Sequence, residues 1–267
     1  AGMNLPGVFE VDGGKKGFFK ISFDSRQVFC YNKLLYFGLR EELVMRMRKK
    51  PNLAPRMERC VDWWVREPEA MPGRWRDLAP ACRSLWVEVG CGKGRFTVET
   101  AAANPDMLLI AMERVPDAMV VAMERCVNDG LTNVFFVDAN ADQLPQFFAP
   151  GEVDRIYLNF SDPWPRSKQA KHRLTHPSYL KAYAMILSPG GRIIQKTDNR
   201  QLFDYSIQSF TENGWTLSHI TYNLHAPETP GEILRQNIVT EYESRFLKEG
   251  LPIHRLEACR PEWRTSS

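Results

Sequence analysis

Apolar residues from about position 84 onward gather into short runs, and amphipathic segments with helical spacing separate these runs. The runs predict strands at 85–89, 108–112, 134–137, 155–160, 192–196 and 215–222. The segments between them predict helices from the first glycine-rich turn to about residue 104 and at 117–130, 177–187 and 199–214. Strands that alternate with helices across short turns are typical of an α/β fold with a doubly wound, mostly parallel sheet. Residues 252–258 can add a last strand, which we expect to be antiparallel.

The segments before residue 81 differ in composition from the regular α/β pattern that follows. We predict an N-terminal extension at 1–44, a basic arm and leading helix at 45–80, a main domain at 81–260 and a tail at 261–267. The beginning of the arm has one acid, Glu58, among the cations Arg46, Arg48, Lys49, Lys50, Arg56 and Arg59. Prolines at 51 and 55 predict that no continuous helix forms there. Such an arm is either a solvated flexible tail or a segment that binds a polyanion.

The composition narrows the class of protein without identifying it. The chain has 267 residues, 43% of them hydrophobic, and a net charge of only +3, so charge alone does not indicate a nucleic-acid partner. Its apolar runs fall short of the roughly 20 residues that a membrane helix needs, which predicts a soluble protein with no membrane partner. Six cysteines form no CxxC pair and no metal-like spacing with the five histidines. We therefore expect no metal site and a reducing, cytoplasmic location.

A glycine-rich turn, VEVGCGKG, follows the first predicted strand and opens the first predicted helix. Gly90, Gly92 and Gly94 allow positive φ angles and let a ligand approach the backbone closely. Glu88 stands just before them, where its carboxylate would oppose a pyrophosphate but suit an ammonium group. Glu113 ends the second strand and can accept hydrogen bonds from two ribose hydroxyls. Together these residues predict a site for S-adenosyl-L-methionine, whose methionine moiety carries an ammonium beside a sulfonium.

Other readings of these residues remain open. Glu113 is equally compatible with NAD, so an NAD-dependent oxidoreductase is an alternative, which Glu88 and the GxGxG spacing oppose. Asn140 follows the third strand at the usual rim of an adenine pocket, where its amide could contact the purine edge or a ligand hydroxyl. Asp138 and Asp142 compete for that role, and a simple loop cap is a further alternative.

The fourth predicted strand leads into the stretch NFSDPWPRSKQAKHRL, residues 159–174. Pro163 and Pro165 reduce the conformational entropy of this loop, and Trp164 can anchor it by packing. Because ligands bind at the carboxyl ends of strands in such sheets, Asp162 would face the transferable group of the donor. The alternative is that Asp162 merely caps a turn. The cations that follow would bind phosphates of a nucleic acid; they are Arg166, Lys168, Lys171, His172 and Arg173.

The combination of VEVGCGKG, Glu113, NFSDPWP with its basic run, KTDNR (196–200) and TEYE (240–243) resembles the bacterial tRNA (guanine-N7)-methyltransferase family. The resemblance covers about residues 45–257 and leaves out the first 44. It implies a Rossmann-like class I methyltransferase fold, S-adenosyl-L-methionine as methyl donor, and tRNA as substrate with a guanine of the variable loop as target. A monomer or a homodimer is expected.

The resemblance also implies a role for each matching residue. It implies that Glu88, Glu113, Asn140 and Asp162 contact the donor, with Asp162 also at the reacting centre. The implied substrate-side residues are Arg166, Asp198, Thr240, Glu241, Tyr242 and Glu243. The family commonly has lysine at the position of Arg166 and aspartate at that of Asn140. Arginine keeps the charge but presents it as a planar fork, and asparagine keeps an acceptor.

The chemistry of guanine N7 is compatible with a carboxylate at the reacting centre. N7 carries an outward-facing lone pair and needs no deprotonation, and the purine becomes cationic as it is methylated. We therefore expect Asp162 to act electrostatically and by orientation rather than as a base. Asp198 and Glu243 are candidates to accept from guanine N1–H and the N2 amine, but Asp198 could instead cap the helix at 199–214, and Glu241 could simply be solvated. A methyltransferase acting on an exocyclic amine is an alternative; those enzymes usually have two adjacent prolines in this loop, which SDPWP lacks.

Overall fold

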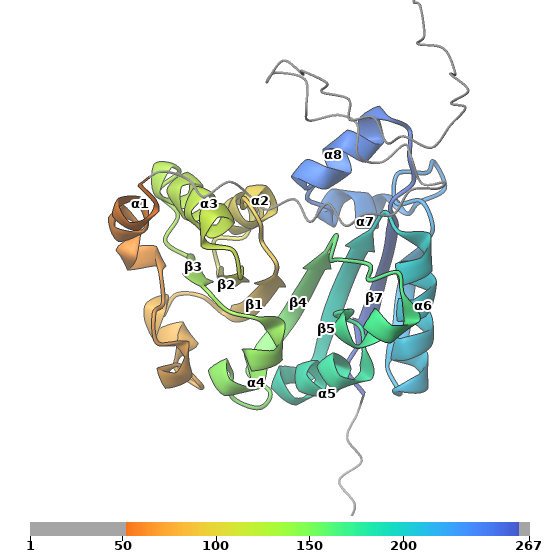
Figure 1. The fold of residues 1–267 in the computed structure, drawn as a ribbon, viewed down its shortest axis with the longest axis horizontal. Coiled ribbons are helices and arrows are strands. Elements are labelled where there is room, and N and C mark those ends of the chain that lie inside the picture. The colour runs from red at the N-terminus through yellow and green to blue at the C-terminus, as the bar shows by residue number, and fades with distance from the viewer. Residues whose placement is uncertain (1–51, 262–267) are drawn as a thin grey trace, which may run out of the picture. The chain divides into compact units, whose positions relative to one another are not determined.

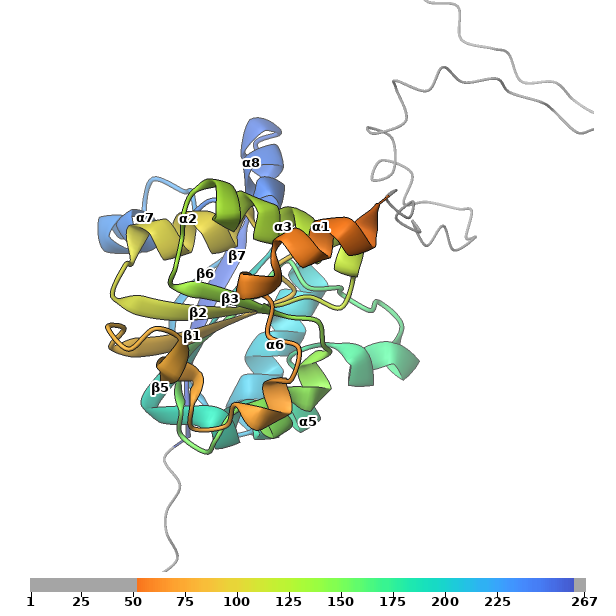
Figure 2. The ribbon, with the colours of Figure 1, turned by 90° about the vertical axis from the view of Figure 1, so that its left-hand side faces the viewer.

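The computed structural model describes residues 52–261, which form a layered α/β fold (Figures 1 and 2). Its seven-stranded sheet contains β1 (Ser84–Val89), β2 (Met107–Met112), β3 (Val134–Val137), β4 (Val153–Asn159), β5 (Leu187–Thr197), β6 (Thr216–Thr221) and β7 (His254–Cys259). The strand order is β3-β2-β1-β4-β5-β7-β6. Neighbouring strands from β3 to β5 are parallel, whereas β7 is antiparallel to both β5 and β6. The predicted doubly wound, mostly parallel sheet with an antiparallel last strand is confirmed.

Helices cover both faces of this sheet. The α-helices are α1 (Leu53–Arg59), α2 (Arg95–Ala103), α3 (Pro116–Asn128), α4 (Leu144–Phe147), α5 (Pro177–Ile186), α6 (Arg200–Glu212), α7 (Gly231–Gln236) and α8 (Glu241–Lys248). Short 3₁₀ helices are η1 (Val61–Trp63), η2 (Pro68–Ala70), η3 (Trp75–Leu78), η4 (Ala141–Gln143) and η5 (Ser167–His172). Figure 2 shows α1, α2 and α3 on one side of the sheet and α5 and α6 on the other. None of the helices within 52–261 combines the length and the apolar character that crossing a bilayer requires.

Strand side chains alternate between two hydrophobic cores. Leu85, Val87 and Val89 of β1 belong to the core on the side of α5 and α6. Leu109 and Ala111 of β2 belong to the opposite core, with α2 and α3. Every residue of β2 is buried, because a parallel strand with helices on both faces exposes neither of them. This double burial explains why the strands are visible in the sequence as continuous apolar runs.

The structure departs from the sequence expectation at several elements. Helix α1 passes through Pro55, which lies in its first turn, where the missing amide hydrogen removes no helical hydrogen bond. Between 60 and 80 the chain forms the short turns η1 to η3. Strand β5 begins at Leu187 and includes the SPGG segment that was expected only to end a helix. Helices α4, α7 and α8 were not among the predicted helices.

The third glycine of the turn after β1 is required by packing as well as by conformation. Gly94 precedes α2 with a φ of 79°, and a Cβ there would overlap the side chain and backbone of Ala122 on α3. Gly130, just after α3, has a similar φ of 63°, but a Cβ there would meet open space. The two positions therefore separate backbone strain from steric overlap.

Replacing Gly94 with alanine is expected to lower the free energy of unfolding by about 3 kcal/mol, because strain and overlap with α3 add together. Gly130→Ala, which introduces only the strain, should lose about 1 kcal/mol. Urea unfolding of the two variants measures the difference. Equal losses would contradict the packing role of Gly94.

Candidate active site

The carboxyl ends of β1, β2, β4 and β5 lie at the same edge of the sheet because these strands are parallel neighbours. This edge brings together the glycine-rich turn after β1, Glu113 after β2, Asp162 after β4 and Asp198 after β5. The sequence predicted a ligand site at this edge, and the strand order places its candidate segments side by side (Figure 1).

The turn after β1 presents open backbone at this edge. Gly90 and Gly92 have φ angles of 82° and 57°, and a Cβ at either position would meet no atom nearby. Glu113 holds the turn, because its Oε2 accepts a hydrogen bond from the Gly92 amide at 2.9 Å and its Oε1 from the Val115 amide at 3.0 Å. Each carboxylate oxygen keeps a further lone pair. Glu113 can therefore hold the turn and still accept from ribose hydroxyls.

Glu88 lies at the end of β1 and is only 2% exposed. Its carboxylate accepts a hydrogen bond from the Thr97 hydroxyl at 2.6 Å and a long one from the Asn159 amide at 3.5 Å. Burial raises the pKa of Glu88 to about 7, although the hydrogen bonds from Thr97 and Asn159 oppose the rise. Beside it, the side-chain oxygen of Asn159 is buried without a hydrogen-bond partner in the described part of the chain.

These two acceptors fit an ammonium group. Such a group can donate hydrogen bonds to both Glu88 and the unpartnered oxygen of Asn159, and its charge favours the ionised carboxylate. The methionine moiety of S-adenosyl-L-methionine carries an ammonium, and the open backbone at Gly90 and Gly92 suits close approach of the rest of the ligand. Sequence reasoning missed Asn159, although it is the first residue of the NFSDPWP stretch.

Replacing Glu88 with glutamine is expected to stabilise the fold above neutral pH while weakening donor binding. Because the folded-state pKa of Glu88 is raised from 4.5 to about 7, the wild type loses stability as the pH rises through this window. The full shift corresponds to about 3 kcal/mol, which glutamine does not lose. Glutamine also lacks the charge that attracts an ammonium, so the dissociation constant for the donor should rise about 10- to 100-fold.

Urea unfolding at about pH 5 and about pH 8, together with calorimetric titration of the donor, measures both effects. Glu99→Gln is the matched control, because Glu99 pairs with Arg95 on the exposed surface of α2. If the stability difference between Glu88→Gln and the wild type is the same at both pH values, Glu88 does not titrate as described.

The loop after β4 holds Asp162 at the sheet edge in a strained conformation. Phe160 and Trp164 have φ angles of 52° and 43°, which bulky residues rarely adopt. The Phe160 amide donates to the Lys196 carbonyl of β5 at 2.8 Å. Asp162 itself is exposed, and its carboxylate makes no hydrogen bond or ion pair with other residues of the described range. It is therefore available to a ligand.

The other single candidates lie around the same edge. Asn140 is exposed at the start of η4, and Arg166 is exposed just before η5. Asp198 is half-buried after β5, and it does not cap α6. Asn199 does so instead, since its side chain accepts from the amide three residues further on at 2.8 Å. The alternative role of Asp198 as a helix cap is therefore wrong.

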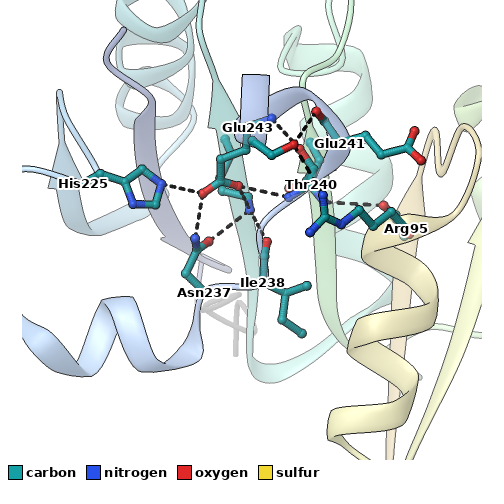
Figure 3. Close-up of polar contacts among 11 residues, drawn as sticks. Arg95, His225, Asn237, Ile238, Thr240, Glu241 and Glu243 are labelled. Atoms are coloured by element: carbon teal, nitrogen blue, oxygen red, sulfur yellow. Dashed lines mark hydrogen bonds and ion pairs between the residues drawn. The ribbon is translucent and has the colours of Figure 1, made fainter. Parts of the chain in front are cut away.

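A buried ion pair anchors α8 to β5. Lys196 Nζ lies 2.7 Å from Glu243 Oε2, and the two side chains are 2% and 0% exposed. Lys196 also donates to the Asn237 side chain at 3.0 Å and to the Ile238 carbonyl at 2.8 Å. Asn237 and His225 each approach Glu243 Oε1 to 2.7 Å (Figure 3). Sequence reasoning missed Lys196, Asn237 and His225, although Lys196 begins the KTDNR motif.

This network determines the pKa values of the pair. Burial lowers the pKa of Lys196, while the charge of Glu243 opposes that change. Burial pushes the pKa of Glu243 upward, but the charge of Lys196 and the hydrogen bonds from Lys196, Asn237 and His225 outweigh it and hold the pKa below its usual value. The donors around Glu243 therefore favour its ionised form, and that negative charge in turn favours the protonated form of Lys196.

The predicted substrate-side stretch at the start of α8 divides into inward and outward residues. Thr240 and Glu243 are buried and cap the helix reciprocally, through bonds of 3.0 Å and 3.3 Å between backbone amides and side-chain oxygens. Tyr242 is 56% exposed and stacks on Phe160 with ring centroids 5.9 Å apart. Glu241 forms an ion pair with an arginine of α3 at 2.7 Å. A substrate could reach the Glu243 carboxylate only by displacing its buried donors.

The basic segments also divide. Lys168, Lys171 and His172 are exposed on η5, whereas Arg173 is half-buried against the loop that carries Asp162. In the basic arm, Arg56 donates to Glu124 of α3 at 2.7 Å. The remaining cations at 46–50 lie outside the described residues, as do the predicted extension at 1–44 and residues 262–267.

A family model described as a putative methyltransferase matches residues 82–256. The tRNA (guanine-N(7)-)-methyltransferase of Geobacillus kaustophilus (strain HTA426) is 41% identical over 222 residues, which cover 83% of this chain and 100% of that protein. The protein of the same name from Bacillus cytotoxicus is 39% identical over 214 residues, covering 80% of this chain and 96% of that protein.

Solved structures share the fold at low sequence identity. The 16S rRNA methyltransferase KamB has a TM-score of 0.54 at 16% identity and covers 71% of this chain and 94% of its own. An antibiotic-related methyltransferase has a TM-score of 0.52 at 14% identity, covering 70% and 92%. The class I methyltransferase fold is thus confirmed, and the sequence relatives identify the group more narrowly. The chain belongs to the tRNA (guanine-N(7)-)-methyltransferase family.

Proposed function

We propose that this protein transfers the methyl group of S-adenosyl-L-methionine to N7 of a guanine in tRNA, in the variable loop. The observation that carries the proposal is the arrangement at one sheet edge of a buried acceptor pair, Glu88 and Asn159, an open glycine turn, and the exposed carboxylate of Asp162. Family membership supports the choice of tRNA and of guanine N7.

The donor side is formed by residues of β1 and β4 and of the turns that follow β1, β2 and β3. When bound, S-adenosyl-L-methionine supplies an electrophilic methyl group on a sulfonium. Glu88 and Asn159 accept hydrogen bonds from the ammonium, and Glu113 accepts from the ribose hydroxyls while it holds the turn. Gly90 and Gly92 leave room for the ligand against the backbone, and Asn140 lies exposed where it can reach the purine edge.

The reaction needs charge stabilisation rather than proton transfer. The N7 lone pair of guanine is already free, so no base is required, and positive charge develops on the purine as the methyl group arrives. Asp162 meets that charge with a carboxylate that no other described residue neutralises. A preoriented charge of this kind is worth about 3–4 kcal/mol in a transition state.

The substrate side combines exposed cations with the exposed Tyr242 and the half-buried Asp198. Arg166, Lys168 and Lys171 bind the phosphates of the tRNA, and Tyr242 and Asp198 face the target guanine. In this arrangement Thr240 and Glu243 act indirectly, by holding α8 in place. A monomer or homodimer in the cytoplasm is the assembly and location that we predict.

The proposal is tested by incubating the purified protein with bulk tRNA and labelled S-adenosyl-L-methionine and then mapping 7-methylguanosine by mass spectrometry. We expect label in tRNA, and chain scission by borohydride and aniline at the modified guanine. Label without scission would favour the exocyclic-amine alternative. Absence of label from a protein that binds the donor would overturn the proposal.

A further inference from the structure

The Arg173 side chain donates hydrogen bonds to the backbone of the loop that carries Asp162. Its Nε lies 3.2 Å from the Pro163 carbonyl oxygen and 3.3 Å from that of Trp164, and its second guanidinium nitrogen, NH2, donates to Trp164 at 3.0 Å. These contacts use the planar fork of arginine, which a lysine ammonium cannot reproduce. Asp162 immediately precedes the two residues that Arg173 holds.

The chain segment that carries Arg173 is itself anchored to α6. The Arg173 guanidinium lies over the ring of Tyr205 at 4.3 Å. Two residues further on, Thr175 is buried, its hydroxyl lies 2.9 Å from that of Ser206, and its carbonyl accepts from Ser209 at 2.6 Å. The position of Arg173 is thus determined by a packed helix, independently of any RNA.

The loop has little other backbone support. Within the described residues, the hydrogen bonds to the backbone of 161–165 are those from Arg173. Trp164 nevertheless keeps a φ of 43°, with its ring 5.1 Å from that of His172. A strained residue persists only where its surroundings hold it. Removing the fork would let Trp164 relax and Asp162 move with it.

We propose that Arg173 is a positioning residue for methyl transfer, which holds Asp162 against the reacting centre rather than binding a tRNA phosphate. This inference rests on the proposed function of Asp162. Lys171, which lies two residues before Arg173 and is exposed, makes no such contact in the described chain and binds the tRNA phosphates. The two cations of one short segment therefore have different tasks.

Arg173→Lys separates the two roles because it keeps the charge and removes the fork. A phosphate contact would tolerate lysine, whereas a positioning residue would not. We expect kcat for tRNA methylation to fall about 10- to 100-fold, because a misplacement of about 1 Å at a reacting centre can cost that much. The KM for tRNA and the dissociation constant for the donor should stay unchanged. Tyr205→Leu, which removes the platform under the guanidinium, should lower kcat in the same direction by a smaller factor. Lys171→Ala should instead raise the KM for tRNA and reduce the salt dependence of binding by about one ion.

A measurement without tRNA keeps the inference independent of the activity. In protein labelled with 5-fluorotryptophan, the ¹⁹F resonance of Trp164 is identified by its loss in Trp164→Phe. We expect this resonance to broaden or shift in Arg173→Lys while the other tryptophan signals and the thermal transition stay as in the wild type. An unchanged Trp164 resonance together with wild-type kcat would overturn the role of Arg173. If the wild type methylates no guanine, the proposed function fails, while the resonance still decides whether Arg173 holds the loop.

Discussion

Asp162→Asn is expected to lower kcat for tRNA methylation by about 100- to 1000-fold, while the protein remains folded and binds both substrates. The amide has nearly the same shape as the carboxylate, so the strained loop and its contacts with Arg173 should persist. What disappears is the negative charge beside the purine, and the purine needs that charge only as it becomes cationic. The effect should therefore appear in kcat rather than in the dissociation constant of the donor.

Single-turnover methylation with saturating tRNA measures this change directly. Asp106→Asn provides the control, since Asp106 is exposed just before β2, at the opposite edge of the sheet from the site. An Asp162→Asn variant that methylates tRNA as fast as the wild type would remove the electrostatic role. So would a loss confined to donor binding.

Lys196→Met is expected to destabilise the protein by about 3–5 kcal/mol, because it leaves the Glu243 carboxylate buried without its cation. Methionine fills most of the same volume, so the loss reflects charge rather than a cavity. The double variant Lys196→Met/Glu243→Gln removes the stranded charge and should be more stable than Lys196→Met alone. The Glu243 contribution to stability is present above its usual pKa of 4.5 and is lost as the pH falls through its lowered folded-state pKa. The gap between wild type and Lys196→Met should therefore narrow in acid.

Urea unfolding of the single and double variants measures this coupling. Lys248→Met is the matched control, because Lys248 is an exposed lysine on α8, the helix that carries Glu243. If the single variant loses no more stability than this control, the buried pair does not hold α8.

Much of the fold could be predicted because strands of the parallel part of the sheet, above all β2, are buried on both faces. Double burial produces the apolar runs of β1, β2 and β3, and the short turns between runs and helices leave few topologies. The extension of β5 back to Leu187 could not be predicted in this way, because Pro189 and two glycines resemble a helix end. Nor could α7, whose six residues carry too short a pattern to show a helical period.

The candidate donor site could be proposed from the sequence in part, because its residues adjoin a recognisable turn. Glu88, Glu113 and the glycines are tied to strand ends, and strand ends are visible in the sequence. The contacts of Lys196 and Arg173 were not, since each depends on which distant segments meet. Lys196 pairs with Glu243, 47 residues later, and Arg173 needs α6 beneath it and the loop above it. A positive charge in a basic run looks the same in the sequence whether it meets a phosphate or a carbonyl.

Neighbouring residues of helix α8 have different environments, one buried and one exposed. Glu243 is committed to the interior, where the loss of Lys196 alone would leave its charge unpaired, and Asn237 and His225 add hydrogen bonds to the same carboxylate. Tyr242, one residue earlier, faces outward and touches none of these groups. Evolution can therefore vary the exposed side of this helix without disturbing the buried ion pair that attaches it to β5.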